Sequence, residues 1–394
     1  MAPVNVVIVG GSFAGLNTAH ALLKDVPNVK IVLINPSRSW YFTIAAPRIF
    51  AKPTAFRSEQ YLVPISDLFA KYPSNKVEFI AGTATAIDAT AKTVSVTETG
   101  SKNAKSLSYD YLVIASGSTT DATTGKITGT PMPFKQTGRE DMKQMIEASQ
   151  QLVQNAKEIV IAGAGPIGVE LAGELADAAA QTGKAGQVSI TLVSATDRVL
   201  SSLKPAGSAA AKQLLEKKKI KLITSQRVTS VQEVTPSDGT KKTWTVSLDN
   251  GDKLSADLYI PTTGVLPNSS FVPTQFLDKD GWVKVDKELR VQGDDSKASL
   301  PIYAAGDITN NWQRFSFKAA EQAGVVAANL KADILGKGSR KTYDQGEAVM
   351  MVVPVGEAGG TGLMFGFTPW SFLVRMIKGK DFFVSKAVSL VAGK

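Results

Sequence analysis

Two glycine-rich turns, in distant parts of the chain, limit what this sequence can fold into. The first lies in VVIVGGSFAG, residues 6–15, and the second lies in IVIAGAGPIGVELAGEL, residues 159–175. Each turn follows an apolar, β-branched run and precedes a helical pattern, which predicts a strand, a sharp turn and a helix. A further buried strand follows each helix, at 29–34 and at 188–193. Each turn therefore opens a β-α-β unit with a parallel sheet.

The glycine spacing in both turns is typical of a cradle for a pyrophosphate group. Glycine permits the sharp turn and a close approach of the ligand, while the free amide groups and the dipole of the following helix favour phosphate. Gly163, Gly165 and Gly168 complete the second pattern, whereas Ser12 replaces the middle glycine of the first. We therefore expect two bound dinucleotides. The predicted contacts are Gly10, Gly11, Ser12, Phe13, Ala14 and Gly15 in the first turn and Gly163, Gly165, Ile167 and Gly168 in the second.

The second β-α-β unit interrupts the first. Strand-like stretches at 76–87 and 92–98 lead to YDYLVIASGS at 109–118, and the second unit begins only after that point. LPIYAAGD at 300–307 and a helix near 315–335 then return to the first unit. The predicted fold class is α/β with two Rossmann-like domains, one inserted in the other, plus a small C-terminal α+β domain. The predicted boundaries are 1–118 with 265–338 for the first domain, 119–264 for the inserted domain and 339–394 for the C-terminal domain.

Composition excludes several kinds of chemistry. The chain has no cysteine, which removes disulfides, thiolate nucleophiles and Cys-based metal or iron–sulfur sites. Its single histidine, His20, excludes triad hydrolases and multi-His metal sites, so no metal site is expected. The net charge of +9 favours anionic cofactors, anionic membrane surfaces or nucleic acid without choosing among them.

The acidic residue that usually ends the second strand and binds the ribose hydroxyls is missing from both units. Asn35 takes its place in the first unit, and an amide can still hydrogen-bond a ribose hydroxyl. Ser194 takes its place in the second, with Thr196 and Arg198 close behind. Loss of the acid removes repulsion toward a 2′-phosphate, and a nearby arginine favours one. NADPH is therefore a candidate reductant beside NADH.

Four motifs in order give the chain a family resemblance. VVIVGGSFAG, YLVIASGS, IVIAGAGPIGVELAGEL and IYAAGD resemble those of the two-domain flavoproteins of the pyridine-nucleotide oxidoreductase superfamily. Within it, IAAPR at 44–48, GVELAGEL and the tail FGFTPWSFLVRMIKGKDFFVS are similar to the apoptosis-inducing-factor-like branch that includes ferroptosis suppressor protein. The resemblance covers nearly the whole chain. It implies FAD in the first domain, NAD(P)H in the inserted domain and reduction of a quinone.

The resemblance also implies roles for single residues. Asp307 resembles the aspartate that binds the flavin ribityl chain, Arg48 resembles an arginine beside FAD, and Ala84 matches a position whose backbone meets the adenine. Glu170 and Lys378 match positions near the nicotinamide and flavin, and they are the candidate catalytic residues. Structural alternatives stay open: Asp307 could cap a helix, Glu170 could favour a helix N-terminus, and Lys378 could be a solvated charge.

The expected activity is hydride transfer from NAD(P)H to FAD, followed by electron transfer to a quinone-type acceptor. Without a cysteine pair, the electrons must leave to a diffusible acceptor. Aromatic residues at 40–42 and Trp370, Phe382 and Phe383 could stack a flat ring or simply form core. WYFT at 40–43 also departs from the branch, which has histidines and an asparagine there, and this puts the acceptor pocket in doubt.

Two other functions stay open. A reductase of a small electron-carrier protein would suit the basic charge, because such partners are usually acidic. A non-catalytic, redox-sensing, nucleic-acid-binding protein of the death-factor type would also use that charge, but the intact glycine turns argue against it, so nucleic acid is not the expected partner.

The sequence also bears on location. MAPVNVVIVGG lacks a basic region and a cleavage site, and no apolar run approaches the length of a membrane span, so secretion and a transmembrane helix are not expected. From Trp370 onward, apolar residues alternate with Arg375, Lys378, Lys380 and Lys386. This pattern suits either peripheral contact with an anionic membrane or an ordinary domain-closing segment. A cytoplasmic protein is expected, and its oligomeric state stays open.

Overall fold

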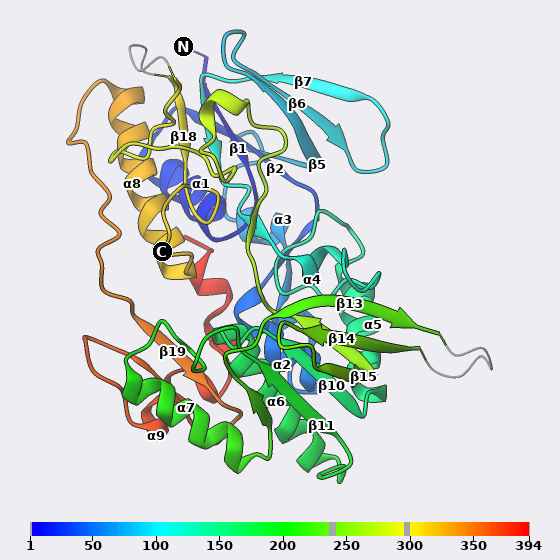
Figure 1. Ribbon diagram of the computed structural model, residues 1–394. Helices are drawn as coiled ribbons and strands as arrows, with labels where there is room; N and C mark the ends of the chain where they lie inside the picture. The colour runs from blue at the N-terminus through cyan, green and yellow to red at the C-terminus, as the bar shows by residue number, and fades with distance from the viewer. Residues whose placement is uncertain (1, 236–241, 295–299, 394) are drawn as a thin grey trace.

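A seven-stranded sheet forms the first unit of the computed structural model, which describes residues 2–235, 242–294 and 300–393 (Figure 1). Its strands are Val4–Val9 (β1), Val29–Asn35 (β2), Val77–Asp88 (β5), Thr93–Glu98 (β6), Ala104–Ser108 (β7), Tyr111–Ile114 (β8) and Ile302–Ala304 (β18). The order is β18-β8-β1-β2-β5-β6-β7. Neighbours from β18 to β5 run parallel, whereas β6 and β7 add an antiparallel edge.

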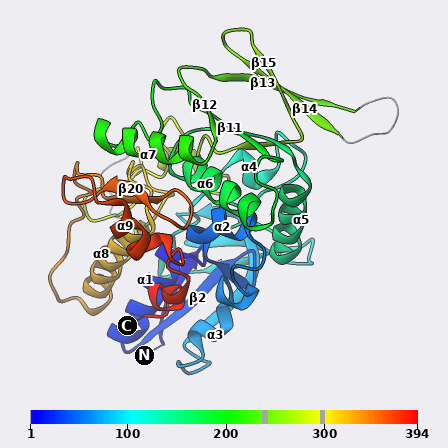
Figure 2. The same ribbon diagram turned by 90° about the horizontal axis from the view of Figure 1, so that it is seen from below.

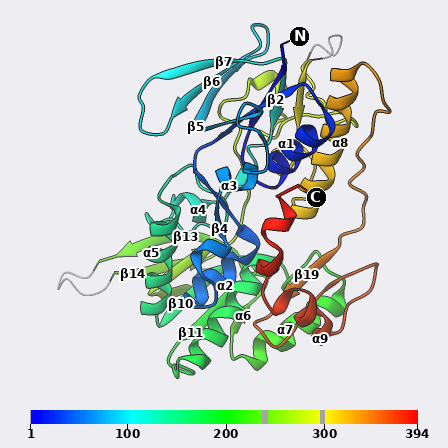
Figure 3. The same cartoon turned by 180° about the vertical axis from the view of Figure 1, so that it is seen from behind.

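Both faces of this sheet are covered, which explains why β1 is almost uniformly apolar. Val6 and Ile8 face the side of helix α1 (Phe13–Asp25), which packs against helix α8 (Ser316–Leu335) (Figure 3). Val7 and Val9 face the opposite side, where they join a second core with residues of 271–291. Because side chains alternate along a strand, one apolar run supplies both cores.

The second unit has its own parallel sheet of four strands, in the order β12-β11-β10-β16. The strands are Glu158–Ala162 (β10), Ser189–Val193 (β11), Lys221–Ile223 (β12) and Leu258–Pro261 (β16), and the helices are Met142–Asn155 (α5), Pro166–Gln181 (α6) and Pro205–Lys217 (α7). A three-stranded antiparallel sheet, Val228–Val234 (β13), Thr243–Leu248 (β14) and Lys253–Ala256 (β15), projects away from this unit (Figure 2). The predicted fold, with a parallel β-α-β unit at each glycine turn, is confirmed.

The two crossings between the units lie side by side. Strand β9 (Ser118–Thr119) pairs antiparallel with β17 (Leu266–Pro267), close to the predicted domain boundaries. A short helix, α4 (Asp121–Thr124), follows β9, and a 3₁₀ turn at Thr274–Phe276 follows β17.

Residues 36–75 form a compact insert between β2 and β5. It contains the hairpin of β3 (Ser39–Tyr41) and β4 (Leu62–Pro64), the helices α2 (Ala46–Ala51) and α3 (Ile65–Phe69), and 3₁₀ turns at Thr43–Ala45 and Ser58–Gln60. Helix α2 packs against α5 and α6, so the insert joins the first unit to the second.

The C-terminal part leaves α8 through Gly336, whose left-handed φ of 63° ends the helix. Residues 337–350 then run along the outside of the molecule to a hairpin at the second unit (Figure 1). The remaining elements are β19 (Met351–Pro354), β20 (Gly360–Leu363), α9 (Ser371–Val374), a π-helical turn at Arg375–Gly379 and 3₁₀ turns at Val384–Lys386 and Val388–Leu390. No helix in the described ranges is long and apolar enough to cross a membrane.

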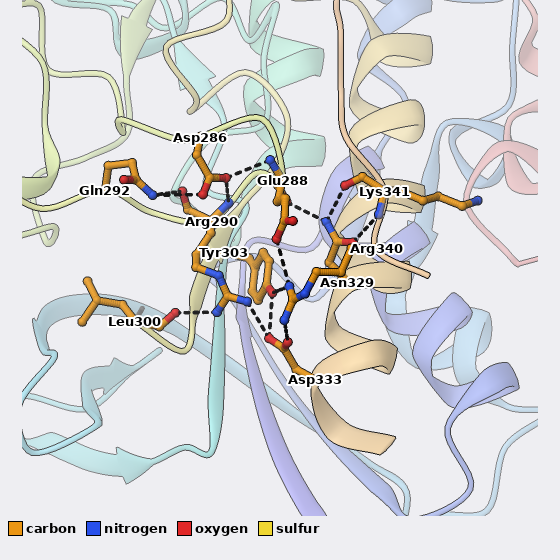
Figure 4. A network of polar contacts seen from close by, with 10 residues as sticks. All are labelled: Asp286, Glu288, Arg290, Gln292, Leu300, Tyr303, Asn329, Asp333, Arg340 and Lys341. Atoms are coloured by element: carbon orange, nitrogen blue, oxygen red, sulfur yellow. Dashed lines mark hydrogen bonds and ion pairs between the residues drawn. The ribbon is translucent and has the colours of Figure 1, made fainter. Parts of the chain in front are cut away.

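A polar network fixes the start of this outer connection (Figure 4). Arg340 pairs with Asp333 of α8 and, at 2.9 Å, with Glu288. The Asn329 side chain accepts a hydrogen bond from the amide of Lys341 at 2.7 Å and donates one to its carbonyl at 2.8 Å. These contacts order the backbone that leads into the C-terminal segment.

Candidate functional site

A cavity of about 810 Å³ opens where the two units and the C-terminal segment meet. Its walls come from the first glycine turn, the carboxyl ends of β2 and β8, the start of α6 and the residues around 350, 364 and 377. Ligands of open α/β sheets bind outside the carboxyl ends of the strands, and the volume suits a small-molecule site.

The first glycine turn forms a cradle that only glycine can build. Gly10 has a φ of +116°, and a Cβ there would lie 2.2 Å from the carbonyl oxygen of Ala115. A Cβ on Gly15 would lie 1.8 Å from the carbonyl oxygen of Gly10, so Gly15 serves close packing and does not itself line the cavity. The other predicted residues of the turn, Gly10, Gly11, Ser12, Phe13 and Ala14, do line it.

Asn35 and Ala84 line the same end of the cavity as predicted, next to the turn. The Asn35 side chain is buried; its oxygen accepts a hydrogen bond from the Gly11 amide at 2.9 Å, and its nitrogen donates one to the carbonyl of Ser37 at 2.7 Å. Asn35 therefore orders the turn at the position where the acid is usually found.

Asp307 also lines the cavity, where it accepts hydrogen bonds from Lys135 Nζ at 2.7 Å and from Ser118 Oγ at 2.8 Å. Burial works to raise the pKa of this carboxyl, but the Lys135 ammonium and the hydrogen bonds outweigh it and hold the pKa below its usual value. Arg314 lines the cavity nearby, and its Nε is buried with no hydrogen-bond partner among the described residues. The sequence motifs did not indicate Lys135 or Arg314, because both lie on irregular segments.

Glu170 and Lys378, the predicted catalytic pair, meet at the cavity wall. Lys378 Nζ lies 2.5 Å from Glu170 Oε1, although the two residues are 208 positions apart in sequence. Burial raises the pKa of Glu170 to about 7; the Lys378 ammonium opposes this shift, and the nearby Glu174 carboxylate adds to it. A buried acid with a pKa near neutrality can exchange a proton at physiological pH.

The second glycine turn has the same build but lies at the edge of this cavity. Gly163 has a φ of +113°, and a Cβ on Gly168 would lie 1.9 Å from the carbonyl oxygen of Gly163. A Cβ on Gly165 would meet no described atom within 4 Å, which leaves room for a ligand to approach this backbone. None of the three glycines lines the cavity, but Ile167, from the first turn of α6, does.

Ser194 is buried at the end of β11 and does not line the cavity. Its Oγ lies 3.0 Å from Thr196 Oγ1 and donates a hydrogen bond to the carbonyl of Arg198 at 3.2 Å. The hydroxyls therefore organise the loop that carries Arg198, beside the second glycine turn.

Arg48 requires a correction, because its guanidinium does not face the cavity. The side chain is 3% exposed and donates two hydrogen bonds to Glu174, at 2.8 and 2.9 Å. Two more go to the carbonyls of Gly379 and Lys380, both at 2.8 Å. The preceding residue, Pro47, lines the cavity instead. This placement does not support a contact between Arg48 and FAD.

The aromatic residues at 40–42 are also placed differently from the predicted acceptor pocket. Their side chains are fully buried in the core of the first unit and do not line the cavity, so the core interpretation holds for them. Phe382 is fully buried as well, Trp370 is exposed, and Phe383 alone of the predicted ring-stacking residues lines the cavity. The neighbouring wall is aliphatic and thioether-rich, with Met350, Met364 and Ile377.

Comparison with known proteins gives matches over nearly the whole chain. Residues 4–324 match the family described as pyridine nucleotide-disulphide oxidoreductase. The chain is 37% identical over 395 residues to oxidoreductase ptaL of Pestalotiopsis fici, with 99% of each chain covered. It is 30% identical over 393 residues to ferroptosis suppressor protein 1 of Xenopus tropicalis, with 98% of this chain and 95% of the relative covered.

Among solved structures, the sulfide:quinone oxidoreductase from the hyperthermophilic bacterium Aquifex aeolicus shares the fold. The TM-score is 0.76 at 19% sequence identity, and the alignment covers 99% of this chain and 92% of that chain.

Proposed function

The chain belongs to the pyridine nucleotide-disulphide oxidoreductase family and is an FAD-dependent pyridine-nucleotide oxidoreductase, and from this premise we propose that its electron acceptor is a small quinone-type molecule. The predicted resemblance to the branch of ferroptosis suppressor protein is confirmed. The observation that carries the proposal is the Glu170–Lys378 pair on the wall of a cavity in a chain without cysteine.

The residues at the first turn fit FAD. The cradle of Gly10–Ala14 would hold the pyrophosphate, Asn35 and Ala84 would contact the adenosine end, and Asp307 would bind the ribityl chain; all of them line the cavity. Arg314 also lines the cavity and places a positive charge near Asp307. Bound FAD supplies the ability to accept a hydride from a reduced nicotinamide and to pass electrons on singly or in pairs.

The open backbone at Gly165 suits the pyrophosphate of the nicotinamide nucleotide. Ile167 and Glu170 are three residues apart on α6 and both line the cavity, so the helix that begins at the second turn also forms part of the cavity wall. Ser194 stands at the ribose position in place of the usual acid, and Arg198 follows four residues later, which supports the use of NADPH beside NADH.

The remaining wall and the ion pair suit a quinone. Met350, Met364, Ile377 and Phe383 offer an apolar surface to a flat ring. Reduction of a quinone to a quinol consumes protons, and Glu170 Oε1 can hold one and exchange it with Lys378 Nζ, 2.5 Å away. With no thiol in the chain to accept the electrons, a diffusible acceptor must take them.

The exterior next to this wall suggests how an apolar acceptor arrives. We call the exposed side chains of Phe365, Phe367, Trp370, Phe372 and Met376 the aromatic surface; Trp370 is 74% exposed and stacks on Phe372 at 6.0 Å. Met364 and Ile377, adjacent in sequence to its two ends, line the cavity. An exposed apolar patch of this kind marks a contact site, and we propose that it contacts a membrane that holds the acceptor.

A spectral titration tests the proposed function. The purified holoprotein should show a flavin spectrum that NADH or NADPH bleaches anaerobically, and a short-chain quinone should restore the colour. Bleaching without restoration by quinones, together with fast turnover of an acidic carrier protein, would instead support the carrier reductase. A flavin that neither nucleotide bleaches, with DNA binding that survives physiological salt, would support the non-catalytic alternative.

A further inference from the structure

Arg48 and Glu174 form a buried ion pair one helical turn along α6 from Glu170. Their side chains are 3% and 0% exposed, and the contact is bidentate, with Arg48 Nε and Nη2 donating to the two carboxylate oxygens. Because residues four apart lie on the same face of a helix, Glu170 and Glu174 are neighbours on one face of α6. One carboxylate meets Lys378, and the other meets the arginine behind it.

The same guanidinium reaches across to the C-terminal segment. Arg48 Nη1 donates to the carbonyl of Lys380 and Nη2 donates to the carbonyl of Gly379, the two residues directly after Lys378. These carbonyls end the π-helical turn at Arg375–Gly379, where a helix leaves its last acceptors unpaired. The guanidinium also lies 4.7 Å from the centre of the Phe382 ring.

The Arg48 side chain thus contacts two parts of the molecule that are far from it, and from each other, in the sequence. Arg48 comes from α2 of the insert, Glu174 comes from α6 of the second unit, and the two carbonyls come from the C-terminal segment. We propose that Arg48, held by Glu174, is a positioning residue that fixes the backbone at 379–380 and thereby places the Lys378 ammonium against Glu170.

The stability of the fold alone does not explain the buried Arg48–Glu174 ion pair. Burying two charges costs solvation energy that their attraction only partly returns, and apolar residues of similar size often serve a core as well. An apolar side chain at position 48, however, would leave the two carbonyls without their donors. The fork of the guanidinium is the only side-chain group that can bind a carboxylate and two carbonyls in one plane.

Arg290 offers a matched control. It is also a buried arginine, with a carboxylate partner in Asp333 at 2.8 Å, a backbone carbonyl partner in Leu300 at 2.9 Å and the Tyr303 ring at 4.5 Å (Figure 4). It does not line the cavity. Arg290→Lys therefore shows how the loss of a buried guanidinium affects the fold in general. Arg48→Lys should show the same effect together with the loss of the fixed position of Lys378.

The test compares wild type, Arg48→Lys and Arg290→Lys by amide hydrogen exchange of 375–383 and by the rate at which an acylating reagent modifies Lys378, both read by mass spectrometry. We expect Arg48→Lys to raise both rates by about tenfold or more, while Arg290→Lys leaves them within about twofold of wild type. Equal rates in all three proteins, or equal increases in both variants, would overturn the proposal. If Arg48→Lys does not fold, Glu174→Gln takes its place with the same expectation.

The consequence for turnover rests on the proposed function and is measured separately. In Arg48→Lys we expect kcat to fall about tenfold or more with KM for the nucleotide within about threefold, and the inflection of the pH profile to move, because Glu170 faces Lys378, Glu174 and Arg48. A wild-type flavin that no nucleotide reduces would refute the proposed function, whereas the exchange and acylation rates would still decide the positioning role.

Discussion

Glu170 is the residue whose protonation should dominate the pH dependence of turnover. Its pKa lies at about 7 because the side chain is buried. If the protonated form supplies a proton to the acceptor, quinone turnover falls as the pH rises through that value. Glu170→Gln should be about a hundredfold slower and should lose the inflection between pH 6 and 8. Steady-state rates with one quinone across this range test the prediction, and an unchanged inflection in Glu170→Gln would contradict it.

The same shift predicts a change in stability with pH. The pKa of Glu170 is about 7 when folded and 4.5 in its reference state, so between these values the native protein binds a proton that the unfolded chain has released. Stability therefore falls as the pH rises through this window, by up to about 3 kcal/mol. Urea denaturation at pH 5 and pH 7.5 should show this fall in the wild type and a smaller one in Glu170→Gln, which has no proton to lose at this position.

Lys378 can be tested by chemical rescue because the chain contains no cysteine. Lys378→Cys removes the ammonium from Glu170 and should lower turnover about tenfold or more, since it leaves a buried acid without its cation. Aminoethylation of the new thiol rebuilds a lysine analogue only at this position, and it should restore a large part of the rate. The same treatment of wild type is the control, and a failure to regain activity after complete modification would argue against a role for the ammonium.

At the scale of elements, a substitution in the second glycine turn can test nucleotide binding without disturbing the fold. Gly165 has an ordinary φ of −75°, and a Cβ there meets no described atom within 4 Å. Gly165→Ala should therefore keep its FAD and its melting temperature, but the methyl group would occupy the space that a pyrophosphate needs. We expect KM for NAD(P)H to rise about tenfold or more.

Gly324→Ala provides the comparison for this prediction. Gly324 lies within α8, where a Cβ would also meet no described atom of the surrounding structure within 4 Å. The substitution should stabilise the protein by about 0.5–1 kcal/mol without changing KM. A KM in Gly165→Ala equal to that of Gly324→Ala would show that the second turn does not bind the nucleotide.

The elements that could be predicted from the sequence are those with local signals. Helix α6 (166–181) directly follows the second glycine turn, as predicted, because the glycine spacing and the apolar period that indicate it lie in one continuous stretch of sequence. The positions of Asp307 and Glu170 at the cavity could be predicted, because their motifs place them at the end of a strand and at the start of a helix. The direction of Arg48 was not predictable, since it depends on how α2 packs against α6 and where the C-terminal segment docks.

The positions of Lys135 and Arg314 at the cavity were also not predictable from the sequence. They lie on irregular segments, where no period or spacing indicates which way a side chain points, and only the folded chain brings them to the cavity with Asp307. Similarly, aromatic composition could not separate the core residues at 40–42 from the exposed Trp370.

At the scale of the whole molecule, the aromatic surface predicts membrane contact. The wild type should co-sediment with anionic liposomes at low salt, and Trp370→Ser with Phe372→Ser should reduce the bound fraction about fivefold, because both rings are exposed and contribute little to the core. Trp312→Ser, a change at an exposed tryptophan outside this surface, should bind like wild type. A change in oligomeric state in place of lost binding would show that this surface is a protein interface.

The Glu170–Lys378 ion pair at the cavity joins α6 to the C-terminal segment, which follows both dinucleotide-binding units in the sequence. Synthesis proceeds from the N-terminus, and domains generally fold in that order. Both glycine turns therefore leave the ribosome before Lys378, the residue that pairs with Glu170, is added to the chain. A chain that ends just before Lys378 also lacks the buried side chains of Phe382 and Val391, so it is expected to take up its coloured cofactor weakly and to turn over slowly.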